Sequence, residues 1–185
     1  MQMTLNLWLP ILLSAVAIFF ASSLIHMVLK WHNADYRKLA NEDEVGAALR
    51  NGSPAPGQYV LPHCLDHKEM ASAAMQKKFN EGPIGFITIR ANGMPGMGKC
   101  LSQWFAYCLV IAAITGSIAR SALGAAPAPG MIACVVATMS FLAFTGGSVQ
   151  MGIWMGKPWR SVVFDALDGA IYATICALVF SWLWV

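Results

Sequence analysis

Two aspartates in an apolar stretch near the C-terminus have the clearest potential for chemistry. Asp165, Asp168 and Tyr172 follow the i, i+3, i+7 spacing that places side chains on one face of a helix. A carboxylate at the centre of a membrane is unfavourable by about 3 kcal/mol, so this face must point into protein or an aqueous cavity rather than toward lipid. Paired carboxylates in such a place can hold a proton or a cation.

His26, in an apolar stretch near the N-terminus, is expected at a similar depth. It lies about one turn from the end of its stretch, and the two aspartates lie about one to two turns from the same side of theirs. The same polar layer should include side chains from two further apolar stretches: Gln103, Tyr107, Ser148 and Gln150. Two interpretations remain open, a proton or ion pathway in which the imidazole relays protons, or a hydrogen-bonded structural cluster that holds the helices together.

A second candidate group, His63, Cys64, Asp66 and His67, lies in the polar central region. Imidazole and thiolate bind zinc or copper, and a helix N-terminus lowers the pKa of a thiol. The group could therefore hold a metal ion or supply the nucleophile of an enzyme at the membrane surface. However, a structural zinc site takes four ligands, and Cys100 is the sole distant candidate. An ordinary loop is the leading interpretation, with zinc or copper as the ion expected if one binds.

The composition indicates which elements must position these residues. Of the 185 residues, 57% are hydrophobic and 11% are charged, and the mean hydropathy is +0.57. Soluble domains usually carry about a quarter of their residues as charged side chains. Four apolar stretches are each long enough to cross about 30 Å of hydrocarbon: residues 5–29, 101–119, 131–150 and 162–184. The sequence predicts an all-α membrane protein, a four-helix transmembrane bundle in contact with the lipid bilayer.

Residues 30–100, between the first two spans, are charged and rich in glycine and proline, which predicts a small α+β insert. Helices are expected from Asn41 to about Gly52 and from Asp66 to about Phe79. Strands are expected at residues 58–61 and 84–89 because these are rich in β-branched and aromatic residues. An insert of about 70 residues is near the lower limit for a self-supporting core, so contact with the bundle or another subunit is expected.

The basic residues predict an orientation. Eleven of the twelve Lys and Arg residues flank the spans on the side of the insert, and only Arg120 lies on the other side. The positive-inside rule then places the insert in the cytoplasm and both termini outside. The net charge is only +3, and no Lys/Arg-rich run could follow a phosphate backbone. Nucleic acid is therefore excluded as a partner.

Three segments carry a resemblance to other sequences: residues 22–29 (SSLIHMVL), 56–64 (PGQYVLPHC) and 168–173 (DGAIYA). They are similar to segments of a group of uncharacterised bacterial four-span inner-membrane proteins, and the resemblance covers most of the chain. It implies the bacterial inner membrane as the location. It implies no activity and no active-site residue.

The leading functional hypothesis is a non-enzymatic membrane component. This component would be an accessory subunit or a small ion- or proton-conducting assembly that uses His26, Asp165 and Asp168. We expect it to form a homo-oligomer or to be a subunit of a membrane complex. The competing hypothesis is a membrane-surface metal-binding protein or enzyme that uses His63, Cys64 and His67. No convincing catalytic constellation favours the second hypothesis over the first.

Overall fold

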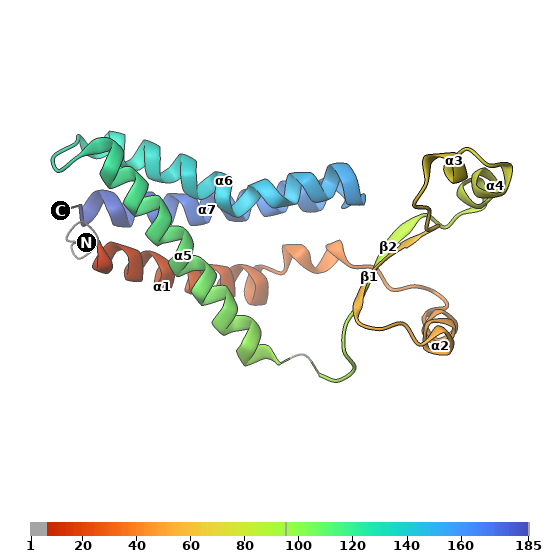
Figure 1. The fold of residues 1–185 in the computed structure, drawn as a ribbon. Helices are drawn as coiled ribbons and strands as arrows, with labels where there is room; N and C mark the ends of the chain where they lie inside the picture. Colours follow the sequence, from red (N-terminus) through yellow and green to blue (C-terminus); the bar gives the residue numbers. More distant parts are fainter. Residues whose placement is uncertain (1–6, 95, 185) are drawn as a thin grey trace. The chain divides into compact units, whose positions relative to one another are not determined.

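The computed structural model describes residues 7–94 and 96–184, which form parts of two compact units (Figure 1). Of the described residues, 7–36 and 96–184 form one unit, and 37–94 form the other. Four helices of the first unit are long and apolar enough to cross a membrane, which confirms the four-span bundle. The chain is therefore a multi-pass membrane protein whose spans contact lipid.

The first span runs from Trp8 to Leu29. It begins as α1 (Trp8–Leu24) and ends in a wider π-helical turn, η2 (Ile25–Leu29). Lys30 then has a left-handed backbone conformation with φ of 54°, and a short 3-10 helix follows, η3 (Trp31–Asp35). Residues 5 and 6 of the predicted span lie outside the described residues.

The other three spans are α5 (Met97–Leu123), α6 (Pro129–Met155) and α7 (Trp159–Trp182). Each helix covers more residues than its most apolar stretch, because hydropathy detects only the part within hydrocarbon. α6 ends where Gly156 adopts the left-handed conformation (φ 70°), and Pro158 immediately precedes the first turn of α7.

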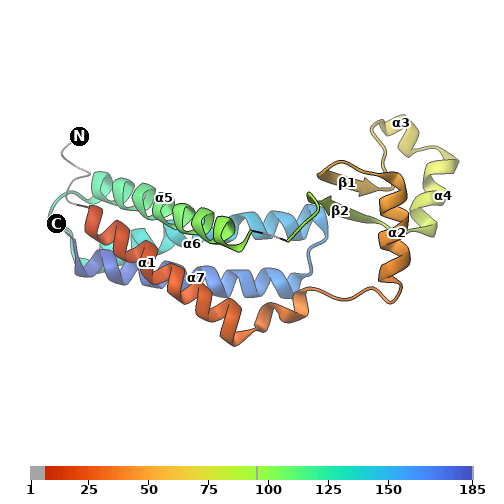
Figure 2. The ribbon, with the colours of Figure 1, turned by 90° about the horizontal axis from the view of Figure 1, so that it is seen from below.

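The four spans pack as a closed bundle. α1 contacts α5 and α7, and α6 contacts the same two helices. α6 and α7 lie side by side along their lengths, whereas α5 is tilted across the bundle in Figure 1 and is seen from another side in Figure 2. Small and apolar side chains fill the interior, as expected for membrane helices that approach closely: Ala15, Ile18, Cys108, Ala112, Val136, Cys176 and Phe180.

The second unit contains a two-stranded antiparallel sheet and three helices. β1 (Gly57–Leu61) pairs with β2 (Gly85–Ile89). α2 (Glu42–Gly52) precedes the sheet, and α3 (His67–Met70) and α4 (Ala73–Glu81) connect its strands. This pattern matches the expected α+β composition of the insert.

One expectation about this region needs correction. The prediction of one helix from Asp66 to about Phe79 is wrong, because the hydroxyl of Ser72 accepts a hydrogen bond from the Met75 amide and starts a separate helix. The residues of η3, at the start of the segment between the first two spans, pack against α7 as part of the bundle.

Candidate functional site

The turn after the first span brings His32 next to His26. The Lys30 amide donates to the Ile25 carbonyl at 3.2 Å, five residues back, so the helix widens there. The left-handed Lys30 ends this turn, and η3 then packs against α7. As a result the imidazole rings of His26 and His32 stack, with 4.9 Å between their centroids and 21° between their planes.

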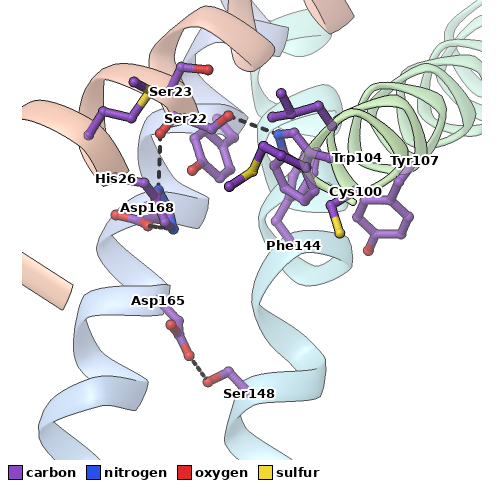
Figure 3. Close-up of a pocket in the computed structure, with 14 residues that line it drawn as sticks. Ser22, Ser23, His26, Cys100, Trp104, Tyr107, Phe144, Ser148, Asp165 and Asp168 are labelled. Carbon is purple, nitrogen blue, oxygen red and sulfur yellow. Dashed lines mark hydrogen bonds and ion pairs between the residues drawn. The ribbon is translucent and has the colours of Figure 1, made fainter. Parts of the chain in front are cut away.

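Asp168 of α7 faces both imidazoles. Its Oδ2 lies 2.9 Å from Nε2 of His32 and 4.0 Å from Nε2 of His26, the latter shown in Figure 3. Asp168 is only 5% exposed, and its Oδ1 has no hydrogen-bond partner among the described residues. We call His26, His32 and Asp168 the His–Asp cluster. Its ligand atoms lie within 4.8 Å of one another, and no other group of three or more His, Cys, Asp or Glu residues in the described chain is close enough to share a metal ion.

The second nitrogen of each imidazole is also hydrogen-bonded. Nδ1 of His26 lies 3.0 Å from the Ser22 carbonyl, and Nδ1 of His32 lies 2.7 Å from Oδ2 of Asp35. A carbonyl and a carboxylate can only accept, so both Nδ1 atoms carry the proton. Asp35 in turn accepts from the Ser161 hydroxyl at 2.8 Å. Both Nε2 atoms are thereby directed at Asp168.

Two carboxylates on opposite sides of its ring determine the charge of His32. Burial lowers the pKa of His32, but hydrogen bonds to Asp35 and Asp168 and their negative charges outweigh burial and raise that pKa above its ordinary value. Burial likewise raises the pKa of Asp35, yet hydrogen bonds from His32 and Ser161 and the nearby positive charges leave it below its usual range. The two carboxylates therefore favour the protonated, positively charged form of His32, which lies between Asp35 and Asp168.

Asp165 belongs to a second polar group, one turn closer to the start of α7. It accepts from the Lys157 ammonium and from the Ser148 hydroxyl, and Lys157 also donates to Ser148 at 3.3 Å. The side chains of Asp165 and Lys157 are 24% and 32% exposed. Asp165 is thus neutralised by a lysine from the turn between α6 and α7, not by His26.

A partly open cavity of about 770 Å³ connects the two polar groups. His26 and Asp168 line it at one position, and Asp165 and Ser148 line it at another, as Figure 3 shows. Its aromatic wall includes Trp104, whose indole N–H donates to the Ser22 hydroxyl at 2.8 Å. Met27, Met97 and Leu101 contribute apolar lining.

Most residues expected in the polar layer line this cavity: His26, Tyr107, Ser148, Asp165, Asp168 and Tyr172. Gln103 and Gln150 are exposed and are not among its lining residues. Tyr107 donates to the Ala143 carbonyl at 3.0 Å, which ties α5 to α6. Sequence reasoning missed His32 and Asp35, although the spacing of three residues between them was a signal that both could face the same helix.

The group around Cys64 has a different environment. The Cys64 thiol donates to the Asp66 carbonyl at 3.2 Å, while His63 and His67 are exposed. Burial and the negative charges of Glu69 and Asp66 raise the pKa of the Cys64 thiol, which is opposite to the shift that activates a nucleophilic cysteine. These residues form no three-ligand group among those the structure describes. A role for them in metal binding or catalysis stays a prediction.

Comparisons with protein-family models, with curated proteins and with solved structures found no match to this chain.

Proposed function

We propose that the protein takes up a cation at the His–Asp cluster and conducts it, either as a small ion-conducting assembly or as a subunit of a larger membrane complex. The observation that carries the proposal is the free Oδ1 of Asp168. A purely structural cluster would use both carboxylate oxygens, because a buried acceptor without a partner destabilises the fold. Here one oxygen remains without a partner among the described residues, on a side chain that lines the cavity.

Two buried hydroxyls lie elsewhere in the bundle. Ser14 of α1 and Ser140 of α6 are fully buried, and both are placed to hydrogen-bond the Cys176 thiol of α7. These contacts link three of the helices, so the support for conduction comes from the cavity and the His–Asp cluster.

The remaining core is mostly apolar, so we propose that a continuous path forms between copies of the chain or with a partner subunit. The packed core of the bundle includes Ala15, Ile18, Val136 and Phe180. An ion crossing hydrocarbon needs polar ligands or water along its whole path. The single bundle supplies these mainly at the cavity end.

Replacing Asp168 with asparagine tests this proposal. We expect wild-type protein in lipid vesicles to carry protons or Zn²⁺. The flux is followed with trapped indicators under a potassium diffusion potential. In the Asp168→Asn variant, the rate of flux should fall to that of empty vesicles. The amide has nearly the same shape but no negative charge. Asp43→Asn, at an exposed position in α2, is the matched control and should conduct normally. Wild-type flux equal to that of empty vesicles for both ions, or full flux in the Asp168 variant, would refute the proposal.

We also propose the bacterial inner membrane as the location, with residues 30–100 in the cytoplasm and both termini outside. The support is the excess of Lys and Arg on one side of the spans and the resemblance described above. Alkaline phosphatase fused after Val185 should be active, because it folds only outside the cytoplasm, whereas a fusion after Gly52 should be inactive. The opposite pattern of activities would contradict this orientation.

A further inference from the structure

The ligand atoms of the His–Asp cluster have the chemistry of a metal site. His26, His32 and Asp168 each offer one ligand atom, and these atoms all lie within 4.8 Å of one another. We propose that these three residues bind one divalent transition-metal ion of the borderline class that includes Zn²⁺ and Co²⁺. This inference rests on the proposed function, which takes up a cation at the same cluster, and it names the class of that cation.

The hydrogen bonds at Nδ1 of the two imidazoles leave both Nε2 atoms facing Asp168. Nδ1 of His26 donates to Ser22 and Nδ1 of His32 donates to Asp35, so in each neutral ring the lone pair is on Nε2. In the metal-free cluster, the Nε2–H of protonated His32 donates to Oδ2 of Asp168 at 2.9 Å. A divalent ion bound to both atoms would displace this proton and keep a positive charge between the ring and the carboxylate.

The distances suit an ion with bonds of about 2.0–2.1 Å. Ligands of one tetrahedral Zn²⁺ are about 3.4 Å apart, a value that lies between the 2.9 Å and 4.0 Å separations of Asp168 Oδ2 from the two Nε2 atoms. His26 must move toward the cluster to complete the site. Its side chain is 54% exposed and lies at the wide turn η2, so it has room to move.

A second layer of contacts orients the His32 ring. Metal-binding histidines generally donate their other N–H to a carboxylate or a carbonyl, which fixes the ring and increases its basicity. Asp35 makes this contact at 2.7 Å and is held by the Ser161 hydroxyl at 2.8 Å. Ser22 provides the corresponding carbonyl for His26. Asp35 is therefore a positioning residue for the proposed site.

The donor set also indicates the kind of site. Two imidazoles and one carboxylate favour Zn²⁺ and related divalent ions over Cu⁺, which prefers sulfur. Three protein ligands leave a fourth position for water or another ligand, unlike structural zinc sites with four protein ligands. His26 and Asp168 line the cavity, so that open position would face space that a water molecule or an exchanging ligand can enter.

The chain contains four histidines, which provide matched controls. Full-length protein without a histidine tag is stripped with chelator in detergent, then titrated with Zn²⁺, and bound metal is measured by mass spectrometry. We expect one Zn²⁺ per chain. His26→Ala and His32→Ala should each weaken affinity by more than about 100-fold, exceeding the roughly 10–100-fold expected for Asp35→Asn. His63→Ala and His67→Ala should leave affinity unchanged.

The absorption spectrum of wild-type protein loaded with Co²⁺ provides a test that does not depend on the folding of any variant. We expect the bands of a four-coordinate ion with nitrogen and oxygen ligands and no thiolate charge-transfer band. Absence of bound metal, a thiolate band, or loss of binding in the His63 or His67 variants alone would overturn the inference. If Zn²⁺ binds but vesicles show no flux, the conduction proposal fails and the metal site stands. If vesicles show proton flux but the protein binds no Zn²⁺, the metal site fails and the conduction proposal stands.

Discussion

Replacing Gly169 with valine is expected to lower the free energy of unfolding of the bundle by about 3 kcal/mol, at the upper end for overpacked interiors. Gly169 is buried where α7 approaches α6. A Cβ atom there would overlap Cγ2 of Thr145 and lie 3.6 Å from Cβ of Phe144. Thr145 is itself buried and hydrogen-bonded to the Phe141 carbonyl, so it cannot turn away freely.

Titration with SDS, followed by tryptophan fluorescence, measures this effect. All seven tryptophans belong to the bundle unit, so the signal reports its unfolding. Gly147→Val on α6 is the control, because a Cβ at that exposed glycine meets no atom within 4 Å. Equal unfolding free energies for the two valine variants would show that close packing at Gly169 is not what holds α6 against α7.

Replacing Lys157 with methionine is expected to destabilise the bundle by about 2 kcal/mol, less than the 3–5 kcal/mol typical when one partner of a fully buried ion pair is removed. Asp165 would keep only its hydrogen bond from Ser148, next to hydrocarbon. The partial exposure of both side chains, 32% and 24%, is the reason for the smaller value. The same SDS titration measures the change.

A double variant separates the ion pair from other effects of the substitution. Lys157→Met combined with Asp165→Leu should recover most of the lost stability, because no unpaired charge then remains in the bundle. Lys99→Met, at an exposed position in the first turn of α5, should cause no loss. If the double variant is less stable than Lys157→Met alone, Asp165 has a stabilising role that does not depend on Lys157.

The spans could be predicted from the sequence because hydrocarbon tolerates few charged residues, and this limits where a membrane helix can lie. The full helix lengths could not be predicted from apolarity alone. α5 includes Gly98, Lys99 and Arg120, which lie beyond the most apolar stretch and still belong to the helix. The break at Ser72 was missed for a different reason. A serine that caps a helix and a serine within a helix look alike in sequence, and the hydrogen bond to Met75 decides between them.

The polar cluster could be predicted only in part. Depth in the membrane was enough to bring His26 close to Asp168, because both positions can be counted from span ends. His32 and Asp35 were assigned to the insert, since nothing in the residue types reveals that Lys30 adopts the left-handed conformation. That conformation is uncommon for residues other than glycine. Asp165 was grouped with His26 because both lie at a similar depth. The contact between Asp165 and Lys157 could not be predicted, since it depends on how the chain turns at Gly156.

The separation of 136 residues between His32 and Asp168 determines when the cluster can exist during synthesis. His26 and His32 leave the ribosome before α7, which carries Asp168, because translation proceeds from the N-terminus. Until then Asp35 is the acid available to His32, and the Nε2 atoms of His26 and His32 lack their carboxylate partner on α7. Closing this contact therefore waits for the synthesis of α7, and a product that ends before α7 cannot form the site.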